Sequence, residues 1–345
     1  MVIKINPARL ALWRDSHTLQ LGLGREAVTL ENIGETQERL INLLYRGIAT
    51  DSLATVVSTI GMPEQETEKL MRQLRPALLD DYEADKADDP NSLHEEFVRQ
   101  AFAEIIRASF ENNIDGRSAL AARSSLQVEL LQLNKTSLML ALGLASAGIG
   151  SIRCDDDAPI EISDTGLLGF DRSQIGKPKN AVLAELLGRS KGPCRLSSRA
   201  SPASKRRGLA LKVIAASHPL SMADFQGFGD YPAEASGAVL AIELGIEQSR
   251  VSPVIRVGAT ACLDCRNLAE ANRDDAWAAL ASQLRFRKER LDDSQTSLLC
   301  AGFALEKSIR YLDSLQPSAF EAHEIDHRTG LVQLQNWPKH PACGC

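Results

Sequence analysis

The sequence predicts an α/β protein of two domains, and three observations support this. The chain has 345 residues, whereas a typical domain has roughly 150. Residues 126–188 alternate strand, helix, strand and helix, the pattern of a parallel sheet covered by helices. Residues 8–79 instead show three short β segments followed by three helices, a winged-helix arrangement. Residues 80–96 hold eight acidic residues and one lysine, typical of a solvated linker or exposed turn, so we place the domains at 1–90 and 97–345.

The elements of the first domain follow from residue periodicity. Three segments alternate apolar and polar side chains, as half-buried strands do: Ala8–Arg14, Thr18–Leu23 and Ala27–Glu31. Three later segments place apolar side chains at helical spacing: Glu35–Tyr45, Ser52–Ile60 and Pro63–Leu79. Asp51 is a suitable N-cap for the second helix, and Pro63 suits the first turn of the third.

The second domain is expected to hold one mainly parallel sheet. Its helices are predicted at Phe97–Phe110, Thr136–Ala147, Pro178–Gly188 and Ser294–Leu315. Its strands are predicted at Leu126–Leu131, Ser151–Cys154, Ala210–Ala215, Val239–Glu243, Ser252–Val257, Ala322–Ile325 and Leu331–Gln335. Residues 189–207 carry seven basic and no acidic residues, together with five serines. We expect a mobile, solvated loop there, whose charge could engage an acidic partner.

Composition and charge exclude several classes of protein. Apolar residues make up 44 % and charged residues 24 %, as in an ordinary globular protein. The chain has 39 basic and 45 acidic residues, so its net charge of −6 argues against whole-chain attraction to nucleic acid or membrane. No signal peptide is recognisable, and the longest apolar stretch, residues 138–152, is too short to cross a bilayer. We therefore expect a cytoplasmic protein whose thiols stay reduced.

The cysteines predict a metal site. Four of the seven form two close pairs, Cys262 with Cys265 and Cys343 with Cys345. Zn²⁺ prefers four tetrahedral thiolates, so two pairs favour a closed, structural zinc site. A CxxC turn alone would also fit a redox motif, the C-terminal pair could be free, and His340 is a possible substitute ligand. The other cysteines are isolated in sequence, and the first and last of them lie in apolar settings typical of core thiols: Cys154, Cys194 and Cys300.

Four stretches carry a resemblance to a known family. They read LALGLASAGIGSIRCDDDAPIEISD (140–164), IGKPKNAVLAELL (175–187), CLDCRNLAEANRDDAWAALASQL (262–284) and WPKHPACGC (337–345). Together with the winged-helix start, whose wing strands would be TLQLGLGREAVTL, they resemble the ThiF-like proteins of ribosomal peptide biosynthesis. These are the leader-binding, cyclodehydratase-associated proteins of thiazole/oxazole-modified microcin clusters. The resemblance covers nearly the whole chain, and the cysteine tail is its most specific part.

The parent ThiF/MoeB fold implies adenylation of a carboxylate with ATP, but much of that machinery has no match here. The turn that should be rich in glycine reads QLNKTS (132–137), without glycine. TGLLGFDRSQ lacks the family's Arg-Gln pair, and VIAASHPLSMAD offers no clear catalytic aspartate. Only Asp155 and Asp157 match the ribose and metal aspartates, and Lys179 the phosphate lysine; all three are also ordinary turn or surface residues. The sequence therefore predicts no catalytic residues and no use of ATP, with an adenylyltransferase carrying a divergent phosphate loop as the alternative.

The resemblance instead implies a scaffold. The winged helix, a RiPP recognition element, would bind the leader of a precursor peptide, and the zinc-bearing body would dock a YcaO-type cyclodehydratase that makes azolines. The leader would add a strand to the edge of Ala27–Glu31 and pack against the helix at Gln65–Leu74. The expected groove residues are Val28, Leu30, Met71 and Leu74, with plain core packing as the alternative for each. Homodimerisation is also implied by the family.

A DNA-binding regulator is a different class that a winged helix could suggest. Residues 1–90 contain ten basic and fifteen acidic residues, a net charge of −5. The would-be recognition helix opens with EQETE (64–68), which would repel phosphates. The charge distribution therefore argues against nucleic acid as a partner of this domain.

Overall fold

The structure is a computed structural model that describes residues 2–79, 93–198, 209–225, 238–287, 289–314 and 321–345. The chain forms two compact units, Met1–Ala121 and Ala122–Cys345. The predicted linker at residues 80–96 lies largely outside the described residues. The division between the units comes later in the chain, so the helices directly after the acidic run belong to the first unit.

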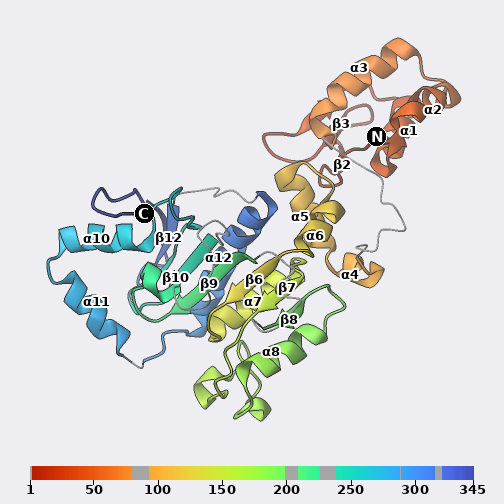
Figure 1. Cartoon of the computed structure of the whole chain (residues 1–345). Helices are drawn as coiled ribbons and strands as arrows, with labels where there is room; N and C mark the ends of the chain where they lie inside the picture. Colours follow the sequence, from red (N-terminus) through yellow and green to blue (C-terminus); the bar gives the residue numbers. More distant parts are fainter. Residues whose placement is uncertain (1, 80–92, 199–208, 226–237, 288, 315–320) are drawn as a thin grey trace. The chain divides into compact units, whose positions relative to one another are not determined.

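The first unit starts with a small antiparallel sheet and continues with helices (Figure 1). The sheet has the order β2-β3-β4, formed by Ala11–Trp13, Leu19–Leu21 and Val28–Leu30. Helices α1 (Glu35–Arg46), α2 (Leu53–Ile60) and α3 (Glu64–Leu74) follow it. The other elements are the strand pair β1 (Val2–Ile3) with β5 (Ile48–Ala49), and helices α4 (Glu95–Gln100) and α5 (Phe102–Asn112). Helix α6 (Gly116–Arg123) begins in this unit and ends beyond its last residue, Ala121.

The six elements expected in residues 8–79 are all present, although the last helix is shorter than predicted. Helix α3 ends at Leu74, and a 3₁₀ turn containing Pro76 replaces the predicted continuation. Side chains from the sheet and from α1 and α3 meet in one apolar cluster, which includes the fully buried Leu21, Leu40 and Leu44. This unit therefore has a core of its own.

The second unit is built on an eight-stranded sheet of order β13-β12-β11-β10-β9-β6-β7-β8. Its strands in chain order are β6 (Gln127–Leu130), β7 (Ser151–Arg153), β8 (Arg195–Ser197), β9 (Leu209–Ala216), β10 (Ala238–Glu243), β11 (Gln248–Val251), β12 (Glu321–Asp326) and β13 (Val332–Asn336). Five neighbouring strands of this sheet are parallel: β8, β7, β6, β9 and β10. Val128 lies opposite Ile152, and Val213 lies opposite Leu240. The three outer strands β11, β12 and β13 are antiparallel.

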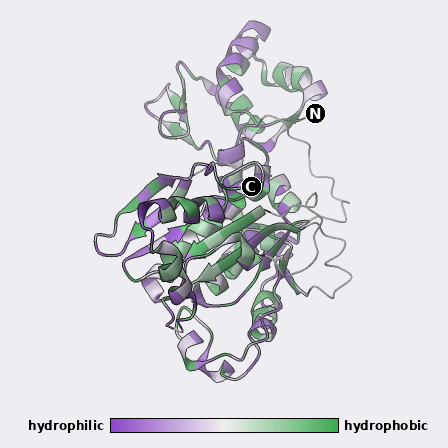
Figure 2. Ribbon diagram, turned by 60° about the vertical axis from the view of Figure 1, so that its left-hand side comes forward, coloured by the Kyte–Doolittle hydropathy of each residue, from purple (hydrophilic) through white to green (hydrophobic). Residues whose placement is uncertain are grey.

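Both faces of the central sheet are covered. The helices of this unit are α7 (Lys135–Ser146), α8 (Lys179–Gly188), α10 (Leu263–Arg273), α11 (Trp277–Arg285) and α12 (Ser294–Ser314). Along β10, Leu240 belongs to the apolar cluster under α7 and α12, whereas its neighbour Val239 belongs to the cluster beside α10. Alternation along a strand therefore separates the two faces, and Figure 2 shows the central strands as hydrophobic.

The α/β prediction is confirmed for this unit, with local differences. The structure places β11 at Gln248–Val251 and not at the predicted Ser252–Val257, because Pro253 cannot donate a ladder hydrogen bond. Residues 195–197, predicted to be part of a mobile loop, form strand β8 at the sheet edge. Residues 199–207 of that predicted loop lie outside the described residues. Helices α6, α10 and α11 were not predicted from the sequence.

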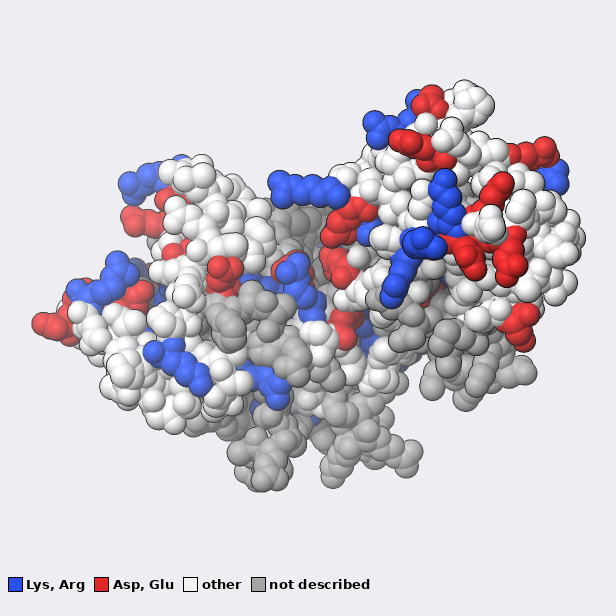
Figure 3. Space-filling view, turned by 90° about the horizontal axis from the view of Figure 1, so that it is seen from above, with Lys and Arg blue, Asp and Glu red and all other residues white. Residues whose placement is uncertain are grey.

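Two further features of the surface and the helices concern charge and membrane-spanning length. On the face that Figure 3 presents, acidic and basic side chains are interspersed, so that view shows no broad area of one sign. Among the described residues, no helix combines the length and the apolar character that crossing a bilayer requires.

Candidate functional site

The turn between β6 and α7 lies where this fold would place a ligand. Strand β6 has β7 on one side and β9 on the other, so the connections leave it in opposite directions. Ligands of open α/β sheets bind at such a switch point, outside the carboxyl ends of the strands. Two side chains of the turn reach across it, because both Gln132 and Asn134 donate to the carbonyl oxygen of Ala215 at the end of β9.

Backbone amides of this turn donate to carboxylates of the protein itself. The amide of Leu133 donates to Asp156 Oδ2 at 2.7 Å, and the amide of Lys135 donates to Asp292 Oδ2 at 3.0 Å. Amides at the start of a helix are the groups that hold phosphate oxygens in nucleotide-binding proteins. At these two positions a phosphate would have to displace a carboxylate that is already bound.

A capping box takes the amides of Asn134 and Ser137. Asn134 caps α7: its Oδ1 accepts from the Ser137 amide at 3.0 Å, and its own amide donates to Ser137 Oγ at 2.8 Å. Such a cap satisfies the helix start with side chains of the same turn. It also explains how a turn without glycine can begin the helix.

A partly buried set of ion pairs supports the turn from the protein side. Lys179 Nζ donates to the Leu133 carbonyl at 2.9 Å and lies 3.2 Å from Asp164 Oδ1. Arg290 bonds both Asp164 and Asp292, the latter at 2.6 Å. Burial opposes ionisation of Asp292, but hydrogen bonds from Arg290 and from the Lys135 amide outweigh it and lower its pKa. Asp292 is therefore an ionised carboxylate at neutral pH.

The three residues predicted to resemble a nucleotide site are only partly brought together. Asp155 lines a cavity of about 410 Å³ that also contacts Gln132 and Asp156, at the carboxyl ends of β6 and β7. Asp157 is exposed and does not line this cavity. Lys179 is buried, and its ammonium contacts the protein groups described above. Sequence reasoning did not single out Asp156 or Asp292, although Asp156 is the middle of three aspartates after a predicted strand and Asp292 belongs to an acidic pair before a predicted helix.

The four predicted metal ligands converge. The sulfur atoms of Cys262, Cys265, Cys343 and Cys345 all lie within 4.8 Å of one another. Individual separations are 3.9 Å for Cys262–Cys265, 3.6 Å for Cys262–Cys343 and 3.3 Å for Cys265–Cys345. Four sulfurs at about 2.3 Å from a tetrahedral Zn²⁺ would lie about 3.8 Å apart. The donor set and its spacing therefore fit a metal ion held by four thiolates.

The structure places the CxxC turn at the start of a helix that the sequence did not predict. Cys262 is the N-cap of α10, and Cys265 lies in its first turn. Burial opposes ionisation of Cys265, but hydrogen bonds from the backbone of His340 and Cys262 lower its pKa to about 7. A helix N-terminus also favours thiolates, the form that binds metal.

The predicted alternative ligand, His340, has other partners. Its Nε2 pairs with Asn272 Nδ2 at 2.9 Å, and its Nδ1 accepts from the Ala342 amide at 3.2 Å. Its carbonyl accepts from the Cys343 amide at 3.0 Å. His340 thus shapes the tail that carries the second cysteine pair. The three isolated cysteines are buried, and burial raises the pKa of two of them to about 12: Cys154 and Cys300.

The four predicted groove residues separate into two kinds. Strand β4 is an edge of its sheet and packs beside α3. Leu30 and Leu74 have no exposed surface and belong to the core, the alternative considered for each residue. Val28 and Met71 are partly exposed and pack on the outside of the same cluster. Only these last two could touch a peptide in this conformation.

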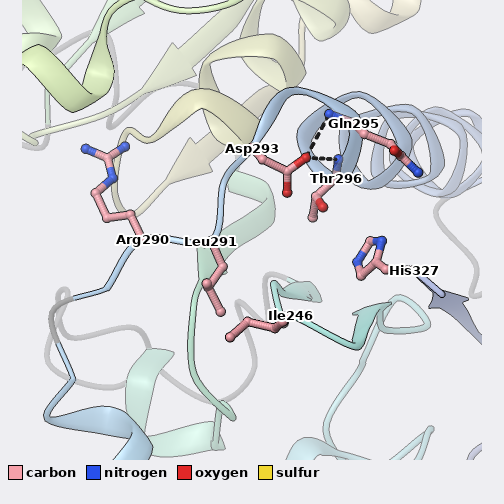
Figure 4. Close-up of a pocket in the computed structure, with 8 residues that line it drawn as sticks. Ile246, Arg290, Leu291, Asp293, Gln295, Thr296 and His327 are labelled. Carbon is pink, nitrogen blue, oxygen red and sulfur yellow. Dashed lines mark hydrogen bonds between the residues drawn. The ribbon is translucent and has the colours of Figure 1, made fainter.

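A further cavity, of about 270 Å³, lies beside the start of α12 (Figure 4). Asp293 accepts from the amides of Gln295 and Thr296 there, which caps the helix. His327 also lines the cavity and pairs with the fully buried Ser249 at 2.7 Å. Figure 4 shows the Arg290 guanidinium directed away from His327. Asp293 is thus engaged in capping α12, and His327 in tying the end of β12 to β11.

The fold is shared with solved structures of low sequence identity. No protein-family model matches the chain, and no curated protein matches it. E. coli MccB, solved with MccA and also with ATP, is 16 % identical, and the alignments cover 100 % of this chain and 99 % of that one with a TM-score of 0.68. PaaA is 13 % identical over 96 % of this chain and 98 % of its own, with a TM-score of 0.66. The chain thus has the ThiF/MoeB-like fold of MccB, as predicted.

Proposed function

We propose that this protein is a non-catalytic scaffold. Its first unit, a winged helix of the RiPP recognition type, binds the leader of a ribosomally made precursor peptide. Its ThiF-like second unit presents the peptide to a YcaO-type cyclodehydratase that forms azolines. The observation that carries the proposal is the free edge of β4 beside α3, with Val28 and Met71 partly exposed above a buried core. Edge N–H and C=O groups give a peptide backbone hydrogen bonds, and alternate side chains fill the groove.

The fold neighbours give this proposal its context. One solved structure is described as the microcin C7 biosynthetic enzyme MccB in complex with N-formylated MccA. Its TM-score is 0.66 at 16 % identity, over 100 % of this chain. A fold that supports peptide biosynthesis in one protein is a reasonable body for leader presentation in another, although fold alone does not fix function. Tethering a leader near a catalytic partner would raise the local concentration of the core peptide.

The zinc ion belongs to this proposal as a structural element. Four thiolates would leave no open coordination position, so the metal would stabilise α10 and the C-terminal tail. A homodimer in the cytoplasm, without nucleic acid or membrane partners, completes the proposed assembly. The net charge of −5 over residues 1–90 agrees with a peptide partner better than with DNA.

The alternative is an adenylyltransferase with a divergent phosphate loop. It is favoured by the cavity of about 410 Å³ beside Asp155 and by a fold neighbour solved with ATP. Two carboxylates on the amides of the turn argue against it. ATP–pyrophosphate exchange separates the two candidates: exchange well above background that Lys179→Ala abolishes would contradict the scaffold.

Leader binding is tested with the full-length chain and fluorescent synthetic peptides that cover the N-terminal halves of short open reading frames encoded beside its gene. We expect Val28→Asp and Met71→Asp each to weaken binding at least tenfold, because a buried charge in the groove has no partner. Leu12→Asp is the matched control, since Leu12 is an exposed residue on β2, the opposite edge of the same sheet. Unchanged affinity in both groove variants, with thermal unfolding like that of the unmodified chain, would refute the groove.

A further inference from the structure

The segment before α12 bonds to the start of α7 through a single carboxylate. Asp292 lies 157 residues along the chain from Lys135, yet its Oδ2 accepts the Lys135 amide at 3.0 Å. Its side chain is only 6 % exposed. The carboxylate therefore occupies the volume at the helix start that an external anion would need.

We propose that Asp292 is an internal anion ligand, which fills the phosphate position of the β6–α7 turn and closes it to nucleotides. This goes beyond leader binding and does not depend on it. The chemical class excluded is phosphate and its esters, and the group that excludes them is a carboxylate of the same chain.

The contacts of Asp292 are those of a bound oxyanion. Besides the Lys135 amide, the carboxylate accepts two hydrogen bonds from Arg290, from Nη2 at 2.6 Å and from Nε at 3.2 Å. An amide at a helix N-terminus together with a guanidinium is the donor set that proteins use for phosphate. Here both donors serve the same carboxylate.

Neighbouring residues hold this segment in position. Arg290 also bonds Asp164, the Leu291 amide donates to Ser217 Oγ at 3.0 Å, and Asp293 caps α12. These three contacts, on residues either side of Asp292, would have to break before Asp292 could withdraw. The packing of the whole segment therefore keeps Asp292 in the phosphate position of the β6–α7 turn, and rotation of its side chain alone would not open that position.

A second carboxylate strengthens the closure. Asp156 Oδ2 accepts the Leu133 amide at 2.7 Å, so two negative charges flank the turn. A phosphate approaching these amides would meet like charges in a partly buried place, where screening is weak. Lys179, the nearby cation, contacts Leu133 and Asp164.

The test is to remove the internal ligand and supply an external one. Inorganic phosphate is titrated into the full chain at constant ionic strength, and the melting temperature is followed. We expect no phosphate dependence for the unmodified chain. For Asp292→Ala, phosphate at about ten times its Kd should raise the melting temperature by about 4 °C, because the freed Lys135 amide and Arg290 then bind it. Asp326→Ala is the control, since Asp326, like Asp292, accepts hydrogen bonds from the backbone, but from the Arg328 and Thr329 amides of a turn.

Hydrogen exchange of the unmodified chain keeps the proposal testable should Asp292→Ala not fold. The Lys135 amide should exchange slowly and respond neither to phosphate nor to Mg-ATP. Phosphate protection of this amide in the unmodified chain would overturn the proposal. So would an equal phosphate effect on Asp292→Ala, Asp326→Ala and the unmodified chain, which would indicate an adventitious ion only.

Discussion

Lys179 stabilises the β6–α7 turn through two protein contacts, the Leu133 carbonyl at 2.9 Å and Asp164 at 3.2 Å. Both side chains of the ion pair are buried, with exposed fractions of 11 % and 1 %. Burying a lysine is expensive unless it is paired and hydrogen-bonded, and these contacts meet that requirement. The lysine therefore has a structural role that needs no nucleotide.

We expect Lys179→Met to reduce the free energy of unfolding by about 2–3 kcal/mol, less than for many buried pairs because Asp164 keeps Arg290 as a partner. Urea denaturation measures this change. Lys177→Met, two residues earlier and exposed, should change stability by less than about 0.5 kcal/mol. Equal effects of the two substitutions would contradict the structural role of Lys179.

The sulfur cluster is the second feature that depends on single residues. Freshly purified protein should contain about one zinc per chain, and Cys262→Ser should remove most of it, because three thiolates leave the tetrahedral site incomplete. Elemental analysis gives the number of zinc ions per chain. The melting temperature of Cys262→Ser should fall together with its zinc content. Cys300→Ala, a buried thiol outside the cluster, should keep the full zinc content. Protein isolated without zinc, yet equally stable, would contradict the assignment.

At the scale of elements, β12 carries a histidine in an apolar setting. His323 stacks on Phe303 of α12 with ring centroids 4.3 Å apart, and its buried Nδ1 has no hydrogen-bond partner. Burial, together with the nearby Lys307 and Arg310, lowers the pKa of His323 to about 4. Because the neutral ring is the form that fits this position, protonation opposes the folded state.

This gives a pH dependence with a defined sign. The unfolded chain takes up a proton at His323 near pH 6.5, but the folded chain does so only near pH 4. Stability associated with this residue is therefore complete above about pH 6.5 and falls as the pH drops towards 4. His323→Phe should lose less stability between pH 7 and pH 4.5 than the unmodified chain, as measured by urea denaturation at each pH. Parallel pH profiles for the two proteins would show that His323 does not titrate in this way.

Most elements could be predicted because their burial leaves a regular or continuous apolar pattern in the sequence. β10 is a nearly continuous apolar run because both of its faces are buried, with Val239 and Leu240 in different apolar clusters, and the cap that begins α7 is local to Asn134 and Ser137. Helix α11 could not be found this way, since none of its residues is fully buried and its pattern is weak. The closure of the turn could not be predicted either, because the bond between Lys135 and Asp292 joins positions 157 residues apart.

The proposed leader groove shows the same limit. Strand β4 and helix α3 were expected to form it, and the two elements do pack together. Which side chains face outward depends on the depth of packing, which periodicity alone does not provide. Leu30 and Leu74 are fully buried, whereas Val28 and Met71 keep some exposure.

At the scale of the whole molecule, the acidic run at residues 80–96 is not where the compact units divide. The first unit extends to Ala121 and includes α4 and α5. Asn6 Nδ2 donates to the Ser109 carbonyl at 2.7 Å, and Asn113 Nδ2 donates to the Leu78 carbonyl at 3.2 Å. These contacts tie the start of the chain to helices that follow the acidic run, so the first unit needs both parts.

The consequence is testable by truncation. A fragment of residues 1–121 should unfold at a higher urea concentration than a fragment of residues 1–90, with a difference of about 2–3 kcal/mol from the lost hydrogen bonds and packing. In the full chain, Asn6→Ala should reproduce about 1–2 kcal/mol of this difference, because it leaves the buried Ser109 carbonyl without its donor. Asn42→Ala, at an exposed position of α1, is the control. If the two fragments were equally stable, the helices after the acidic run would belong to a separate folding unit, and the boundary expected from composition would be the correct one.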